Sequence, residues 1–189
     1  MSNPATTSQI ARAFTDPVRQ AQSSFRGILA AMAEPGTIHD VVASIDPPSG
    51  FHAATTAVLL TSADRDTRVW IDPTLGNDAA AYLRFHTGAP KADSRETSQF
   101  AVVGGRYTGF DAFNAGSDSF PDTSTTVVVQ CASLTGGAPV ALVGPGIKGQ
   151  RMITPVGLHA GFWDEIAQNN KAYPRGIDVL LVAQAALIG

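Results

Sequence analysis

The stretch Val140-Ala141-Leu142-Val143-Gly144-Pro145-Gly146-Ile147-Lys148-Gly149 decides between two kinds of fold. Its glycines at 144, 146 and 149 satisfy the G-x-G-x-x-G spacing of a dinucleotide-binding turn, directly after an apolar strand pattern. Such a turn needs a helix to begin within it, because the helix N–H groups hold the pyrophosphate. Pro155 follows closely and disfavours helix at the residue before it. We therefore predict extended backbone after this bend, and no nicotinamide or flavin chemistry.

The chain is sparsely charged for its length. Of its 189 residues, 44% are hydrophobic and 15% are charged, against about 25% charged in typical soluble domains. Two explanations stay open: a partner covers part of the surface, or the chain is only rich in glycine and alanine. The net charge of -3 argues against a nucleic-acid-binding protein, which normally carries a basic face.

No segment predicts export or membrane insertion. Residues 1–15 lack the basic start and apolar core of a secretory signal. The apolar run 51–63 is too short to cross a bilayer. Cys131 is the single cysteine, in a strand pattern that predicts a buried, inert thiol. We expect a cytoplasmic protein that does not span a membrane.

The pattern predicts a loose arm over residues 1–15 and one α/β domain over residues 16–189. Asp16-Pro17 reads as an N-cap followed by a first-turn proline, and Glu34-Pro35-Gly36 as the end of that helix. Apolar residues at three-to-four spacing predict the face that lies on the core. They are Val18, Ala21, Phe25, Ile28, Leu29 and Met32.

The later pattern alternates strands and helices. Thr125–Cys131 and Val140–Val143 read as two strands joined into a hairpin across Gly136-Gly137. Several strands are apolar on both faces, which predicts helices on either side of a sheet that the hairpin makes mixed: a three-layer α/β/α fold. Strands are also expected over 37–43, 68–72, 100–103 and 177–182, helices over 51–63, 76–88 and around 158–166, and irregular backbone over 104–124.

No pattern in the sequence assigns a catalytic role to a particular residue. His39, His52, His86 and His159 have neither cysteine partners nor zinc-site spacing, so no metal site is predicted. No G-x-S-x-G elbow occurs. A pair of facing carboxylates stays open, because nothing in the sequence marks such a pair. Lys91, Lys148 and Lys171 all fall in turns or at a helix end, so a pyridoxal-phosphate lysine is not expected, and no cofactor is predicted.

Anion binding is the chemistry that the residues leave most open. Glycine turns and helix N-termini present N–H groups to phosphate, here around Gly76-Asn77-Asp78 and at Gly144 and Gly146. Charged or polar side chains could add hydrogen bonds to phosphate or phosphonate oxygens. The alternative is that these groups are a helix cap, a turn and surface ion pairs. The candidate anion site comprises Arg84, His86, Gly144, Gly146 and Arg151.

Several separate segments, in order, resemble one known family over roughly residues 16–183. They are Phe25-Arg26, Met32–Gly36, Thr55–Thr61, Ala63–Thr67, Val69-Trp70, Leu83–Pro90, Gly144–Ile147, Arg151–Ile153 and Pro174–Asp178. Together these are similar to the H subunit of the bacterial carbon-phosphorus lyase machinery, the PhnH family. This chain departs from the family pattern in two places. It ends at the apolar Ala186–Gly189, where the family usually continues, so the presence of a C-terminal strand stays open. Residues 104–122 have no clear counterpart in the family.

The resemblance implies a fold similar to the large domain of pyridoxal-phosphate-dependent transferases, without the cofactor site. It also implies a core complex with the G, I and J subunits, which forms a ribose 1-alkylphosphonate 5-triphosphate from ATP and alkylphosphonate. A later radical step in the J subunit breaks the carbon-phosphorus bond. The family provides no catalytic residue that can be assigned to this chain.

Three functions remain open from the sequence. The chain could be a subunit that orders the complex and contacts ATP or alkylphosphonate there, without a complete active site of its own. It could be an independent enzyme for a phosphate- or phosphonate-bearing molecule, using Arg84, His86 and Arg151 around a glycine turn. It could also be a simple binding module for such a molecule. By resemblance and by the frequency of two-fold pairs, we expect a homodimer in isolation.

Overall fold

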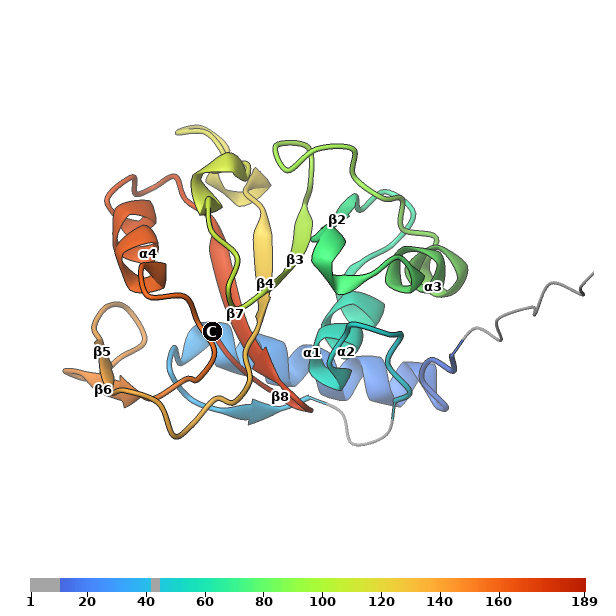
Figure 1. Ribbon diagram of the computed structural model, residues 1–189, viewed down its shortest axis with the longest axis horizontal. Helices are drawn as coiled ribbons and strands as arrows, with labels where there is room; N and C mark the ends of the chain where they lie inside the picture. Colours follow the sequence, from blue (N-terminus) through green and yellow to red (C-terminus); the bar gives the residue numbers. More distant parts are fainter. Residues whose placement is uncertain (1–10, 42–44) are drawn as a thin grey trace, which may run out of the picture.

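A six-stranded mixed sheet forms the centre of the molecule (Figure 1). The structure is a computed structural model that describes residues 11–41 and 45–189. The strand order is β1-β8-β7-β4-β3-β2, in which β2, β3, β4 and β7 are parallel and β8 lies antiparallel between β7 and β1. These strands are β1 (His39–Asp40), β2 (Val69–Ile71), β3 (Phe100–Gly104), β4 (Thr126–Gln130), β7 (Asp178–Ala183) and β8 (Ala186–Ile188).

Alternation along the parallel strands divides the core between the two faces of the sheet. On one face, Val128 of β4 packs with Val102 of β3 and with α1 (Pro17–Ala33), α2 (Ala53–Ser62) and α3 (Asp78–Thr87). On the other, Val127 and Val129 pack with α4 (Phe162–Asn170) and with β5 (Val140–Leu142) and β6 (Arg151–Ile153). The prediction of an α/β fold with a mixed sheet between helices is confirmed.

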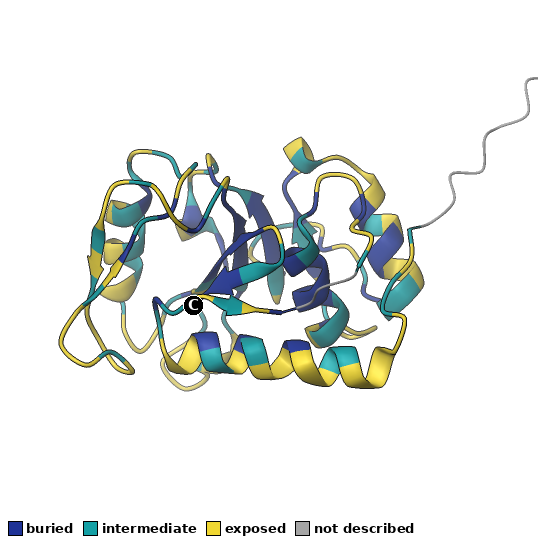
Figure 2. Cartoon of the chain, turned by 90° about the horizontal axis from the view of Figure 1, so that it is seen from below, coloured by how far each residue is buried: buried dark blue, intermediate teal, exposed yellow. Residues whose placement is uncertain are grey.

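Helix α1 begins and ends where the sequence predicts, but it buries a different face. The Asp16 carboxylate accepts a hydrogen bond from Arg19 N at 3.2 Å, and Gly36 takes the left-handed conformation after the helix. Of the predicted core stripe, Ile28 is buried, whereas Val18, Phe25, Leu29 and Met32 are 81%, 55%, 56% and 43% exposed. Figure 2 shows α1 with this exposed side turned away from the sheet.

Small residues explain why α1 turns this way. Ser24 and Ala31 are fully buried, and the Ser24 hydroxyl donates to Val41 O at 2.9 Å. A Cβ added to Gly27 would lie 3.0 Å from Cγ1 of Val41. Small side chains let the helix approach the β1 edge closely, so the larger apolar side chains are left outside. The predicted stripe was therefore wrong in its orientation.

Helices α2 and α3 match their predictions. Six consecutive residues of α2, Ala54–Leu59, are buried, as expected for a helix without a polar face. Helix α3 buries Ala79, Tyr82 and Leu83 and ends at Gly88, whose φ is +79°. The described part of the expected N-terminal arm contacts this helix, because Nε2 of His86 lies 3.0 Å from Ala11 O. Residues 1–10 of that arm lie outside the described residues.

The predicted hairpin is wrong. β4 is flanked by the parallel strands β3 and β7, and β5 pairs instead with β6 in a separate two-stranded sheet. The turn of the real hairpin is the glycine-rich stretch 143–150, so extended backbone does follow Gly149, as predicted. The main sheet is mixed because β8 is antiparallel to both of its neighbours, β7 and β1, not because of that hairpin.

The remaining predictions concern the irregular segment, the cysteine and the first strand. Residues 104–124 are irregular, as predicted, with short 3-10 turns η2 (Phe110–Ala112) and η3 (Pro121–Thr123); a third, η1 (Pro73–Leu75), follows β2. Cys131 is buried, and burial raises the pKa of its thiol to about 12, which agrees with an inert residue. The strand expected over 37–43 is limited to β1 among the described residues, and residues 42–44 lie outside them.

Candidate functional site

The carboxyl ends of the parallel strands, where open α/β sheets usually bind ligands, are covered by the chain itself. Gln130 at the end of β4 holds the segment that precedes α2. Its Oε1 accepts hydrogen bonds from His52 N at 2.7 Å and the Thr55 hydroxyl at 2.8 Å, and its Nε2 donates to Gly50 O at 2.7 Å. The N–H of Gly105 after β3 donates to Gln130 O at 2.9 Å. These contacts hold the segment before α2 against the carboxyl end of β4.

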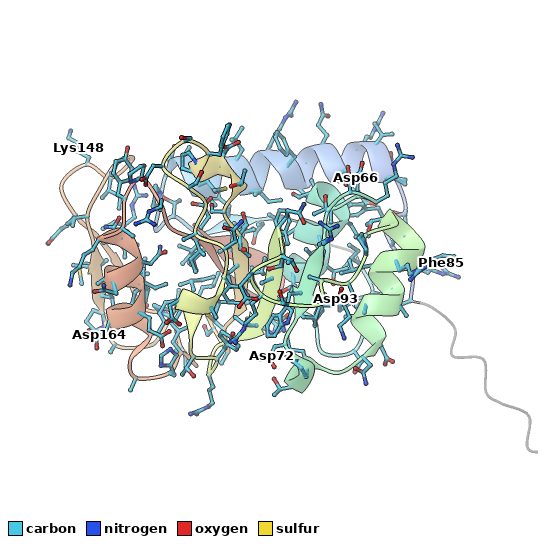
Figure 3. All side chains as sticks on the ribbon, turned by 90° about the horizontal axis from the view of Figure 1, so that it is seen from above. Asp66, Asp72, Phe85, Asp93, Lys148 and Asp164 are labelled. Carbon is cyan, nitrogen blue, oxygen red and sulfur yellow. The ribbon has the colours of Figure 1, made fainter. Side chains whose placement is uncertain are left out.

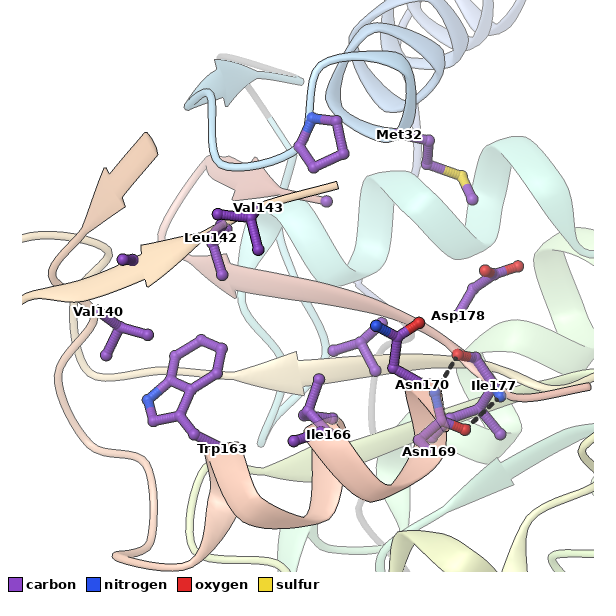
Figure 4. Close-up of a pocket in the computed structure, with 15 residues that line it drawn as sticks. Met32, Val140, Leu142, Val143, Trp163, Ile166, Asn169, Asn170, Ile177 and Asp178 are labelled. Carbon is purple, nitrogen blue, oxygen red and sulfur yellow. Dashed lines mark hydrogen bonds between the residues drawn. The ribbon is translucent and has the colours of Figure 1, made fainter. Parts of the chain in front are cut away.

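A cleft opens instead between α4 and the β5–β6 hairpin (Figure 4). Its volume is about 500 Å³, and a second cavity of about 290 Å³ shares several of its walls. Val140, Leu142 and Val143 face Trp163 and Ile166 across it, as the close-up shows. Met32 at the end of α1 and Val179 of β7 complete the apolar lining. The cleft therefore suits an apolar surface or the apolar part of a ligand.

Polar groups at one end of the cleft come from α4 and the start of β7. Asn169 holds the bend before β7: its Oδ1 accepts from Ile177 N at 2.8 Å and its Nδ2 donates to Ile177 O at 3.0 Å. Asn170 and Asp178 make no side-chain hydrogen bond to the described part of the chain. The residue Asp178 as a whole has a large solvent-accessible area. Its carboxyl group, however, lies partly buried against the cleft wall, and this burial raises the pKa of the carboxyl above its ordinary value. These two side chains remain able to contact a bound group.

Arg151, one of the candidate anion-binding residues, holds the end of α1. Its Nη1 donates to Glu34 O at 3.0 Å, to Pro35 O at 2.8 Å and to the hydroxyl of Thr37. A guanidinium at this position also complements the partial negative charge at a helix C-terminus. Gly146 lies against the same end, since an added Cβ would be 2.8 Å from Cδ of Pro35. Both residues fasten the hairpin to α1.

The other candidate anion-binding residues lie elsewhere. Arg84 and His86 are on α3, at the opposite end of the molecule from the β5–β6 hairpin (Figures 1 and 3); Figure 3 labels Phe85 and Lys148 at these two ends. Gly144 and Gly146 lie in the hairpin turn. The structure therefore does not bring the five residues into one site. Anion binding by either group stays a prediction.

Glu165 makes a set of contacts that the sequence did not indicate. Its Oε2 accepts from Gly109 N at 2.9 Å and from Phe110 N at 3.0 Å, which fastens α4 to the irregular segment before β4. Nε2 of His159 lies 3.2 Å from Oε1, outside hydrogen-bond geometry, and Nδ1 of His159 accepts from Gly161 N at 3.2 Å. The partners are more than fifty residues apart, so no local pattern could have revealed them. The contacts of Glu165 therefore have a structural role, because they hold α4 against Gly109 and Phe110.

Within residues 11–41 and 45–189, no three side chains of the His, Cys, Asp and Glu types come together as metal ligands would. In the same part of the chain, every helix is too short or too polar to cross a bilayer.

Comparison with known proteins identifies the family of this chain. A family model described as "Bacterial phosphonate metabolism protein (PhnH)" matches residues 12–189. The chain belongs to the PhnH family. The match covers the sheet, the four helices and the β5–β6 hairpin, so the cleft and the Arg151 contacts are part of the PhnH domain.

Two relatives carry descriptive names. The chain is 42% identical over 179 residues to "Alpha-D-ribose 1-methylphosphonate 5-triphosphate synthase subunit PhnH" of Rhizobium meliloti (strain 1021), covering 93% of this chain and 90% of that relative. It is 26% identical over 164 residues to "Putative C-P lyase subunit protein HtxG" of Stutzerimonas stutzeri, covering 86% of this chain and 78% of that relative. Both names describe subunits of multi-subunit enzymes.

Proposed function

We propose that this chain is the H subunit of a carbon-phosphorus lyase core complex. In that role it serves the formation of ribose 1-alkylphosphonate 5-triphosphate from ATP and alkylphosphonate, ahead of carbon-phosphorus bond cleavage. The observation that carries the proposal is the 42% identity to the synthase subunit over nearly the whole of both chains.

The subunit orders the complex rather than holding a complete active site of its own. Two structural facts support this part of the proposal. The strand ends that usually bind ligands are tied to the preceding loop by Gln130, and the open cleft is lined mostly by apolar side chains, as a contact surface would be.

The proposal extends to partners and location. The partners are the G, I and J subunits, the compartment is the cytoplasm, and the subunit forms a homodimer in isolation. The similarity to the large domain of pyridoxal-phosphate-dependent transferases, without their cofactor site, belongs to the same proposal. Light scattering of the isolated chain checks the dimer, and a monomeric mass would contradict it.

Genetic complementation tests the function. A phosphonate-using bacterium that lacks its own H subunit should not grow with methylphosphonate as the phosphorus source, and this chain should restore growth. Failure to restore growth, with the chain expressed and folded, would contradict the proposal. Turnover of ATP and alkylphosphonate by the purified chain alone would favour the alternative of an independent enzyme.

A further inference from the structure

The outer face of α1 carries a row of exposed apolar side chains. Val18, Phe25, Leu29 and Met32 are each more than two-fifths exposed, and their spacing places them along one side of the helix. We call this set the α1 stripe. Figure 2 shows exposed residues along this side of α1 over its whole length. A row of this kind is typical of a helix whose second face is covered by a partner.

The α1 stripe continues into the cleft. Met32 belongs to both, because it also lines the cleft beside Pro35, Leu142 and Val143 (Figure 4). Val143, 71% exposed, extends the apolar surface to the hairpin. A partner that covers the stripe can therefore extend into the cleft over Met32 and Pro35.

Charge on α1 indicates the chemistry of that partner. Arg19 and Arg26 border the stripe on one side, because they are seven residues apart and each follows a stripe residue. No acidic residue lies within Pro17–Ala33. Arg19 pairs with Asp16, with Nε 3.7 Å from Oδ2, whereas Arg26 makes no ion pair within the described residues. The complementary surface has an apolar row with carboxylates along one edge.

A second copy of this chain fits the stripe less well. In an antiparallel two-fold pair, the arginines of both helices fall on the same side of the seam and repel each other. In a parallel pair, each arginine faces the Ala21 and Ile28 side of the other helix and gains no carboxylate. The four side chains of the stripe also offer less than the roughly 800 Å² per partner that specific interfaces bury, so the occupant must reach into the cleft as well.

We propose that the α1 stripe and the adjoining cleft dock an amphipathic helix of another subunit, whose apolar row is flanked by acidic side chains. This inference rests on the proposed function, since it assigns a surface to the assembly of the complex. Phe25 and Leu29 provide the central contacts, and Arg26 selects the partner by its charge.

The test is co-purification of the full-length chain with the neighbouring subunits after co-expression. Phe25→Asp and Leu29→Asp each place a charge in the stripe and should reduce the captured partner by about tenfold or more. Arg26→Glu should reduce it by a smaller factor, about twofold to fivefold, and should weaken its dependence on salt. Phe85→Asp is the matched control, because Phe85 is 68% exposed on α3, outside the α1 stripe and at the opposite end of the molecule from the cleft, and it should capture partner as the wild type does.

Each outcome is informative when circular dichroism shows that the variants fold. Undiminished capture by both Phe25→Asp and Leu29→Asp overturns the inference and leaves the proposed function standing. Loss of the homodimer in these variants also overturns it, because the occupant is then a second copy. Absence of any partner with the wild-type chain contradicts both the proposed function and the inference.

Discussion

The inner and outer faces of α1 reverse the usual relation between size and burial. The inner face approaches the sheet edge with Ser24, Gly27 and Ala31, whereas the outer face exposes Phe25 and Leu29. Burial of large apolar side chains is the dominant stabilising term in folding. This arrangement gives α1 a close contact within the chain and leaves its outer face available for the partner helix that we propose.

Helix α2 provides the contrast. It is apolar all round, and its residues from Ala54 to Leu59 are buried on every side within the chain. Its composition is explained by the fold alone, whereas that of α1 is not.

The largest expected effect comes from placing the same charge on the two faces of α1. Ala31→Asp puts a carboxylate at a fully buried position and should lower the free energy of unfolding by about 3 kcal/mol or more. Leu29→Asp should change it by no more than about 0.5 kcal/mol, since the side chain is 56% exposed. Urea unfolding measures both, and equal losses would show that the two faces are not different.

Removal of the Arg151 contacts should have the next largest effect. Arg151→Ala leaves the carbonyls of Glu34 and Pro35 without their donor and should cost about 1–3 kcal/mol of stability. The exposed Arg84→Ala, on α3, is the matched control and should cost less than about 0.5 kcal/mol.

Calorimetry with phosphate and ATP on the same two variants tests the anion-site hypothesis. Lost binding in Arg151→Ala with unchanged stability would favour an anion-binding role over the fastening of α1.

The smallest expected effect concerns the carboxyl of Asp178 in the cleft. Burial raises its pKa in the folded chain, so the folded state holds the proton more tightly than the unfolded state. The protonated carboxyl therefore stabilises the folded state at low pH, and this stabilisation is lost as the pH rises through the raised pKa. Asp178→Asn should therefore raise the Tm by roughly 1 °C at pH 7, with no gain at acidic pH. A gain of the same size at both pH values would contradict this explanation.

Local sequence chemistry predicted the elements of the fold well. Asp16-Pro17 and Gly88 mark helix ends where the structure has them, because capping depends on residues within one turn. Pro155 correctly indicated that no helix follows the glycine bend at 144–149. The nearly uniform apolarity of α2 correctly indicated that this helix is covered on several sides.

Errors occurred where the answer depends on long-range packing. The orientation of α1 depends on how closely Gly27 approaches Val41, and the apolar spacing alone cannot distinguish its two apolar faces. The hairpin was misassigned because Gly136-Gly137 and the glycines from 144 to 149 are both acceptable turns, and pairing with β6 decides between them. The strand β8 depends on a turn at Gln184, a non-glycine residue with a φ of +52° that no sequence pattern signals.

The candidate site was the least predictable part. The role of Arg151 depends on carbonyls more than a hundred residues earlier in the chain, and the cleft is formed by segments from α1, β5, α4 and β7. The family, by contrast, was recognisable from ordered segments spread over the chain, and the family model that matches residues 12–189 confirms it.

Thiol labelling of Leu29→Cys tests the central claim most directly. The native Cys131 is buried and its thiol has a pKa of about 12, so a maleimide should report on the introduced cysteine alone. We expect rapid labelling of Leu29→Cys in the isolated chain and labelling slowed by about tenfold or more in the assembled complex, whereas Phe85→Cys should label at the same rate in both. Equal labelling of Leu29→Cys in the isolated chain and in the complex would contradict a partner contact at the α1 stripe.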